Sequence, residues 1–285
     1  MKKERHPKGQ RRQALKAQVK AKPGLTAVYI ILRALVIVAI VAQSFKGNFE
    51  NVFLCVLTLF LFTLPSFLER TIRIEIPDTL EVIILLFIFA AEILGEIQAY
   101  YIQYPYWDTM LHTLNGFLCA AIGFSLLDII NRNEKLKFSL SPVYLAVVAF
   151  CFSMTIGVLW EFFEFSMDQL FLLDMQKDTV VHSIGSVMLD PAGGNHPISI
   201  KHITDVIVVT ADGAQQSLGL GGYLDIGIID TMKDLFVNFI GAVVFSTIGF
   251  IYVKNRGKGK FAPQFIPTVV DDAETPSDQN GPTQE

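Results

Sequence analysis

Acidic residues and one histidine recur at helical spacing near the ends of apolar segments. Asp108 is followed four residues later by His112, and Asp230 is followed four residues later by Asp234. Residues three or four apart lie on the same face of a helix, so each series presents its polar groups on one side. Such groups are costly inside a membrane unless they are paired, hydrated or bound to a cation, and their grouping predicts a functional site. The candidate site residues are Asp108, His112, Glu161, Glu164, Asp168, Asp230, Asp234 and Asn238, and a further apolar segment adds Glu92 and Glu96.

The chemistry of this set is that of a divalent metal site. Carboxylate oxygens and one imidazole suit Mg²⁺, Mn²⁺, Ca²⁺ or Zn²⁺ as a cofactor, and every residue of the series from Asp108 to Asn238 is a candidate ligand. A bound ion would polarise a phosphate or activate water, with a carboxylate or the histidine as base. Without a metal, the same groups would share and relay protons, as in transporters, and the spacing leaves both alternatives open. The candidate catalytic residues are Asp108, His112, Glu161, Glu164 and Asp234.

The composition is that of a membrane protein. Hydrophobic residues make up 52% of the chain and charged residues 18%, with a mean hydropathy of +0.45, which a soluble chain of this length would not have. We therefore expect membrane lipids, and no nucleic acid, as partners. The cysteines Cys55, Cys119 and Cys151 lie in separate apolar segments without CxxC spacing, which indicates neither a disulfide framework nor a zinc site.

Apolar runs long enough to cross a bilayer as helices of about 20 residues define the fold class. The basic approach to the first run resembles a signal peptide, but Ile40, Val41 and Ala42 make a poor cleavage site, so we expect an uncleaved helix. The sequence thus predicts an all-α polytopic membrane protein with about six transmembrane helices and a long outer loop. The predicted spans are residues 25–43, 52–68, 79–99, 108–130, 143–165 and 230–253.

Three regions follow from these spans. Residues 1–24 form a basic N-terminal tail, and residues 25–253 form the membrane domain, including the outer loop at 169–229. Residues 254–285 are predicted to be a disordered cytoplasmic tail, because the chain becomes acidic and rich in Pro, Ser, Thr and Gln toward its end.

Positive charges predict the orientation. Lys and Arg number 18 in the two tails and the connections after the second and fourth spans, against three in the other connections. Because cytoplasmic connections carry the excess of Lys and Arg, both termini are assigned to the cytoplasm of a bacterial plasma membrane. An aromatic belt is then expected at the outer interface, formed by Tyr100, Tyr101, Tyr104, Tyr106 and Trp107.

This topology assigns every candidate site residue to the outer half of the membrane. The third span ends with Glu92 and Glu96, and the fourth and sixth spans begin with Asp108 and Asp230. The inner half shows no matching charges in the sequence, so no continuous polar path is expected across the bilayer. That difference favours an enzyme over a transporter.

Ordinary structural roles compete with a functional one. Asp108 and Asp230 suit helix N-caps, and Glu92 and Glu96 lie close enough to the interface to reach water. The deeper groups have no comparable supply of basic partners, so we favour a functional role for them. These are His112, Glu161, Glu164 and Asp234.

The outer loop carries the signals of a β-hairpin. Residues 198–210 show the alternating pattern of a β-strand, and Ala211, Asp212 and Gly213 suit a hairpin turn. Residues 215–220 then form the second arm of the hairpin. We expect this hairpin to cap the acidic cluster. The loop histidines His182, His196 and His202 are better interpreted as ordinary loop residues than as ligands.

Three motifs resemble a known family. Trp107-Asp-Thr-Met-Leu-His112, Trp160-Glu-Phe-Phe-Glu164, and Asp230-Thr-Met-Lys-Asp234 with Asn238 and Gly241 resemble the YjdF-like family of bacterial inner-membrane proteins over residues 50–253. They are more distantly similar to VanZ-like proteins, and that likeness implies a link to glycopeptide tolerance and the cell envelope. Neither resemblance implies a reaction.

The leading hypothesis is therefore a hydrolase or transferase that acts on an envelope lipid or a lipid-linked precursor at the outer leaflet, using an outward-facing metal site. The main alternative is a proton- or cation-coupled transporter, in which the same carboxylates line a path. A third is a non-catalytic envelope sensor or scaffold that uses the outer loop.

Overall fold

The computed structural model describes residues 21–72, 74–132, 140–255 and 257–269, and the fold is mainly helical. The basic tail predicted at 1–24 lies mostly outside these residues. The helices are α2 (Pro23–Phe45), α3 (Phe49–Leu61), α4 (Leu64–Ile72), α5 (Asp78–Phe89), the π-helix η1 (Ala90–Ile97), α6 (Tyr100–Gln103), α7 (Trp107–Arg132), α8 (Pro142–Phe171) and α9 (Ile228–Lys254).

Five helices in the described part of the chain are long and apolar enough to cross a membrane. They are Pro23–Phe45, Phe49–Thr71, Trp107–Asp128, Pro142–Phe171 and Ile228–Lys254. The span predicted at 79–99 is built differently, because α5 continues into η1 at Ala90 without a break. Together α5 and η1 form a continuous helix roughly 30 Å long at the usual helical rise. Its hydrogen bonding changes from α-helical to π-helical turns at Ala90.

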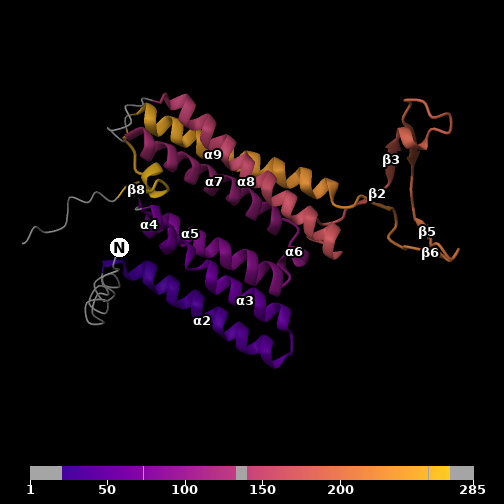
Figure 1. Cartoon of the computed structure of the whole chain (residues 1–285), viewed down its shortest axis with the longest axis horizontal. Helices are drawn as coiled ribbons and strands as arrows, with labels where there is room; N and C mark the ends of the chain where they lie inside the picture. The colour runs from indigo at the N-terminus through magenta and orange to yellow at the C-terminus, as the bar shows by residue number, and fades with distance from the viewer. Residues whose placement is uncertain (1–20, 73, 133–139, 256, 270–285) are drawn as a thin grey trace, which may run out of the picture.

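The helices form two groups (Figure 1). In one, α7, α8 and α9 contact one another along their lengths, and in the other α2 packs against α3 and α5. We call the end at which α7 and α9 begin and α8 ends the loop end, and the opposite one the termini end. Glycines allow α7 and α9 to touch: a Cβ atom at Gly241 would lie only 2.0 Å from the carbonyl oxygen of Thr113. Small residues at a helix contact are the usual way to bring two membrane helices together.

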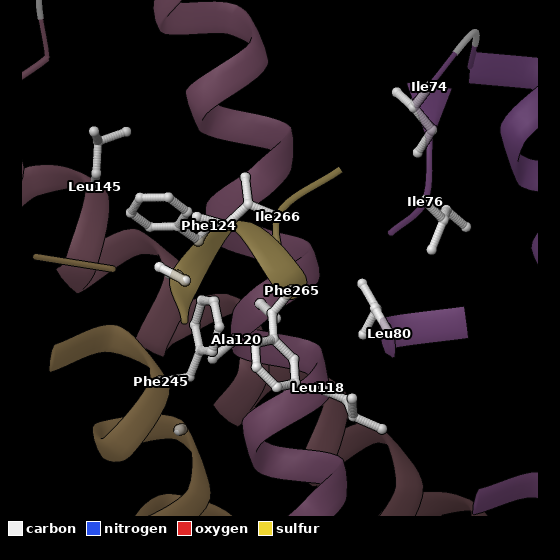
Figure 2. Close-up of a cluster of buried hydrophobic side chains, with 14 residues drawn as sticks. Ile74, Ile76, Leu80, Leu118, Ala120, Phe124, Leu145, Phe245, Phe265 and Ile266 are labelled. Atoms are coloured by element: carbon white, nitrogen blue, oxygen red, sulfur yellow. The ribbon is translucent and has the colours of Figure 1, made fainter. Parts of the chain in front are cut away.

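The two groups are joined at the termini end by the segment that follows α9. This segment forms the short 3₁₀ helix η3 (Ala262–Gln264) and the strand β8 (Thr268–Val269), which pairs antiparallel with β1 (Ile74–Glu75). Phe265 and Ile266 lie between Leu80 at the start of α5 and Phe124 and Phe245 of the other group (Figure 2). The structure therefore differs from the predicted disordered tail at 262–269, where apolar side chains are buried. Residues 270–285 lie outside the described residues.

The loop between α8 and α9 contains three antiparallel strand pairs. β2 (Val180–Val181) pairs with β7 (Tyr223–Leu224), β3 (Ser183–Ser186) with β4 (Ile198–Lys201), and β5 (Ile207–Val209) with β6 (Gln215–Ser217). The predicted hairpin turn is confirmed, with Gly213 at a φ of 82°. The strand predicted at 198–210 is instead divided into β4 and β5, because β4 pairs with β3 and His202 turns the chain with a φ of 59°.

The loop strands do not cover the acidic residues. Figure 1 shows β3, β5 and β6 beyond the loop end of the helices, connected to them through β2. The cap expected from the hairpin is therefore not formed in this structure. The loop part that does contact the helix ends is the short segment before β2, which begins after α8 and contains Met175, Gln176 and Lys177.

Candidate functional site

Three helices bring the deeper candidate residues together at the loop end. Asp108 and His112 lie in the first two turns of α7, and Asp234 lies in the second turn of α9. Glu161 lies on α8, ten residues before the helix ends at Phe171. The exposed fractions of His112, Glu161 and Asp234 are only 8%, 5% and 1%, so these side chains must find their partners inside the protein.

The imidazole of His112 is flanked by carboxyl groups on both sides. Its Nε2 atom lies 3.4 Å from Oδ1 of Asp108 and 4.0 Å from Oδ2 of Asp234. Its Nδ1 atom lies 3.8 Å from Oε1 of Glu161. The two ring nitrogens thus face carboxylates that come from different helices.

Ligand atoms of Asp108, His112 and Asp234 lie close enough for one cation. One such atom from each side chain is within 4.8 Å of the other two. Atoms bound to one ion at about 2.0–2.4 Å lie at most about 4–5 Å apart. These three residues are therefore compatible with a shared metal ion, whereas the full predicted series is not gathered around one point.

Two buried carboxylate oxygens in the cluster have no hydrogen-bond partner among the described residues. They are Oε2 of Glu161 and Oδ1 of Asp234. An ionised oxygen buried without a donor is costly, so each of them calls for a cation, a proton or a water molecule. This need arises at the same place as the three converging ligand atoms.

Asp168 and Asp230 make structural hydrogen bonds instead. The Asp168 carboxylate accepts from the backbone N–H groups of Met175, at 2.7 Å, and Gln176, at 2.9 Å. Asp230 accepts from the backbone N–H of Lys177 at 2.8 Å, and its other oxygen lies 3.7 Å from Nζ of Lys233. Both residues tie the start of the loop to the helix ends.

Asn238 and Glu164 are buried, but neither belongs to the three-residue group. The amide oxygen of Asn238 accepts from Asn115 at 3.2 Å. Its amide group fills the space left by Gly157, where a Cβ atom would lie 2.7 Å from Nδ2. Oε1 of Glu164 accepts from the indole N–H of Trp160 at 2.8 Å. Asn238 therefore supports the packing beneath the cluster.

Glu92 and Glu96 lie on η1, apart from the three-helix cluster. Glu92 is half-buried and Glu96 is exposed. Tyr101 of α6 packs against Gly95 of η1. Burial raises the pKa of its phenol, and the negative charges of Asp108, Glu96 and Glu92 raise it further. The predicted second acidic pair is therefore not part of the group formed by Asp108, His112 and Asp234.

Sequence reasoning missed two buried carboxyl groups at the termini end. Glu81, with an exposed fraction of 4%, accepts a hydrogen bond from the hydroxyl of Tyr29 at 2.6 Å. Asp128 is also buried. The expectation that this half lacks charged groups is therefore wrong. Glu81 could have been found as an acidic residue within the apolar third span, although nothing in the sequence pairs it with Tyr29.

The described fold and the buried polar cluster define the class as a multi-pass integral membrane protein. The family described as a predicted membrane protein (DUF2238) matches residues 26–255, and the chain belongs to it. An uncharacterised protein of Thermotoga maritima is 24% identical over 106 residues, which cover 37% of this chain and 53% of the relative. The match thus spans about half the length of that relative. No solved structure matches the chain.

Proposed function

We propose that this protein is a divalent-metal-dependent hydrolase or transferase of the bacterial plasma membrane, acting on a phosphorylated envelope lipid or lipid-linked precursor. One observation carries the proposal: His112 lies between the Asp108 and Asp234 carboxyl groups on one side and Glu161 on the other. In metal sites a histidine binds the ion through one nitrogen and donates the other N–H to a carboxylate. The orphaned oxygen of Asp234 supports the same assignment.

The residues take distinct roles in this proposal. Asp108, His112 and Asp234 hold the cation, and Glu161 orients the imidazole through Nδ1. A bound divalent cation polarises a phosphoryl oxygen and makes water a better nucleophile near neutral pH. Glu164 is buried on α8, three residues after Glu161, and is the candidate proton acceptor.

The depth of the cluster supports a lipid substrate. Asp108 and Asp234 lie within about 9 Å of the loop-end termini of their helices at 1.5 Å per residue. Along α8, Glu161 is roughly 28 Å from Pro142 at the same rise, which is close to the thickness of the hydrocarbon core. Both estimates put the cluster near the level of lipid headgroups, where phosphates lie.

Charge distribution supports an outward-facing site. In the sequence, the two tails and the connections after the second and fourth predicted spans carry 18 Lys and Arg residues, against three in the other connections. By the positive-inside rule both termini are cytoplasmic and the loop end faces out. The faint VanZ-like resemblance agrees with an envelope role. Cysteine labelling of residue 201 in the loop from outside the cell tests the orientation, and labelling from the cytoplasm alone would contradict it.

Metal analysis of the purified protein tests the proposal. We expect bound divalent metal in the wild type and a loss of affinity of about 10–100-fold in Asp234→Asn and Glu161→Gln, as for ligands and their orienting partners. Asp168→Asn is the matched control, because its carboxylate is committed to the backbone of Met175 and Gln176. Absence of metal from the wild type, or equal loss in the control, would contradict the proposal.

A second candidate function is proton- or cation-coupled transport. The observation that favours it is the buried Glu81–Tyr29 pair at the termini end, because polar groups then occur in both halves of the membrane domain. A transporter exposes its site alternately to both sides. Asn238→Cys, probed from each side, separates the two: cytoplasmic labelling that depends on substrate supports transport, and access from outside alone supports the enzyme.

A further inference from the structure

A groove lies on the surface of the three-helix group, between the beginning of α8 and the latter half of α9. It has a volume of about 360 Å³. Small side chains at Ala146 and Ser246 leave this space, and the exposed side chains of Val147 and Thr247 form its rim. The Thr247 hydroxyl donates to the backbone carbonyl of Val243, and the Ser246 hydroxyl oxygen is buried. The groove therefore offers an occupant mainly apolar contacts.

The groove has the depth of one leaflet of a bilayer. Its lining on α8 begins at Val143, the second residue of that helix, and its lining on α9 begins at Val243. Val243 is about 16 Å from Lys254, the last residue of α9, at the usual helical rise. Half of the hydrocarbon core is about 15 Å thick. The groove thus runs from the termini end toward the middle of the membrane, over the depth that the acyl chains of one leaflet occupy.

A lysine lies at the termini-end mouth of the groove. Nζ of Lys254 lies 5.6 Å from the ring centroid of Phe250, which lines the groove. Among the described residues, no carboxyl group forms an ion pair with Lys254. The exposed residues Lys258 and Lys260 follow it in the chain. Basic residues just beyond the end of a membrane helix attract anionic lipid headgroups.

The basic mouth favours a lipid over a second copy of the chain as the occupant. Two copies in one membrane have the same orientation, so a symmetric pair that met at this groove would bring the same lysines together. Such a juxtaposition of like charges is unfavourable. An anionic phospholipid matches the groove in both respects, because it has an apolar chain and a negative phosphate at one end.

We propose that this groove binds an anionic phospholipid, with one acyl chain beside Ala146 and Ser246 and the phosphate near Lys254. By the positive-inside rule the lipid belongs to the cytoplasmic leaflet, whose surface carries the negative potential of anionic lipids. The groove lies at the opposite end of α9 from Asp234, so the inference does not depend on the metal site. The bound lipid is a ligand distinct from the substrate of the proposed reaction.

Native mass spectrometry of the delipidated full-length protein in detergent micelles tests the headgroup. The protein is titrated with phosphatidylglycerol, which is anionic, or with phosphatidylcholine, which is zwitterionic. We expect tighter binding of phosphatidylglycerol, and Lys254→Gln should weaken it about fivefold, as for one basic residue beside an anionic lipid, while phosphatidylcholine binding stays unchanged. Lys233→Gln is the matched control, because this lysine lies near the opposite end of the same helix.

Substitutions in the groove test the position of the acyl chain. Ala146→Phe places a ring in the space and should weaken binding of both lipids about tenfold or more, because excluding two methylene groups already has that effect. Val147→Trp obstructs the exposed rim and provides the same test if Ala146→Phe fails to fold. Val244→Trp is the matched control, since Val244 is similarly exposed on α9 and does not line the groove.

Three results would overturn the inference. The first is equal affinity of the wild type for the two lipids, or unchanged phosphatidylglycerol binding in Lys254→Gln. The second is lipid binding that survives both groove substitutions. The third is a wild-type dimer that Val147→Trp dissociates and Val244→Trp does not, because the groove then holds a second copy of the chain. None of these results involves the metal ligands, so each leaves the proposed function intact.

Discussion

Gly116 of α7 lies against the backbone of Asn238 in α9, where a Cβ atom at residue 116 would be 2.1 Å from the Asn238 carbonyl oxygen. This contact fixes how closely the two helices approach one turn below His112 and Asp234. Because backbone cannot yield as a flexible side chain does, the glycine sets the distance between the two halves of the candidate site.

Gly116→Ala is therefore expected to push α7 and α9 apart. Overpacking of this kind costs about 1–3 kcal/mol, and it should also lower metal affinity by separating His112 from Asp234. Thermal unfolding in detergent and Mn²⁺ titration measure the two effects. Gly24→Ala is the control, because no atom of the described residues beyond its chain neighbours and its own helix lies within 4 Å of a Cβ there. A variant at 116 that is as stable and binds metal as well as the control would refute the contact's role.

Asp168→Asn should loosen the start of the loop without affecting the metal site. The carboxylate accepts from the backbone N–H groups of Met175 and Gln176, and an amide accepts through one oxygen only. Hydrogen exchange at these two positions should become faster, and metal content should stay at the wild-type level. Unchanged exchange would show that the segment is held by other contacts, such as the hydrogen bond of Lys177 to Asp230.

Asp205 gives the loop a dependence on pH. The Ser217 hydroxyl, followed by the backbone N–H groups of Val206 and Gly219, holds the pKa of Asp205 below its ordinary value of 3.8. A carboxyl group with a lowered pKa in the folded state contributes fully above its unfolded pKa, and the contribution is lost as the pH falls through the folded pKa. The protection of the Gly219 amide from exchange, relative to its intrinsic rate at each pH, should therefore fall at a pH below 3.8 and stay constant above it. Ser217→Ala should move the transition upward, and a transition that stays in place would count against this hydrogen bond.

Phe265 is expected to be the main contact of the segment that joins the two helix groups. Its ring lies 5.1 Å from that of Phe117 and 6.4 Å from that of Phe245, measured between centroids. Removing a buried phenylalanine ring costs about 3–5 kcal/mol, so Phe265→Ala should lower the unfolding temperature markedly. Phe261→Ala is the comparison, because that side chain is 53% exposed and should matter much less. Equal shifts of the unfolding temperature in the two variants would contradict the role of Phe265 as the main contact of this segment.

The sequence predicted the convergence of Asp108, His112 and Asp234 because membrane topology and helical spacing are both visible in one chain. Two spans have an acidic residue at their start, and a third has Glu161 near its end, so these groups come to one end of a helical bundle. Their grouping into a set of three, with Asn238 left out, depended on details of packing. Asn238 is satisfied by Asn115, and no periodicity marks Asn115 as its partner.

Other features depended on tertiary contacts that no local pattern reports. The π-helical turns of η1 occur where the ring of Tyr101 fills the place of a side chain at Gly95, a contact between segments joined by a tight turn. The ordered segment at 262–269 is short and contains prolines, so alone it has neither helical nor strand periodicity. It is ordered because Phe265 and Ile266 find an apolar space between the two helix groups.

Coordination of a divalent cation by His112 is the central claim, and pulsed electron paramagnetic resonance of Mn²⁺ bound to the purified protein tests it most directly. The account predicts modulation from one imidazole nitrogen in the wild type, which persists in Asp168→Asn and disappears in His112→Ala together with a loss of affinity of about 10–100-fold. Bound Mn²⁺ without nitrogen modulation, or modulation that survives in His112→Ala, would contradict the account.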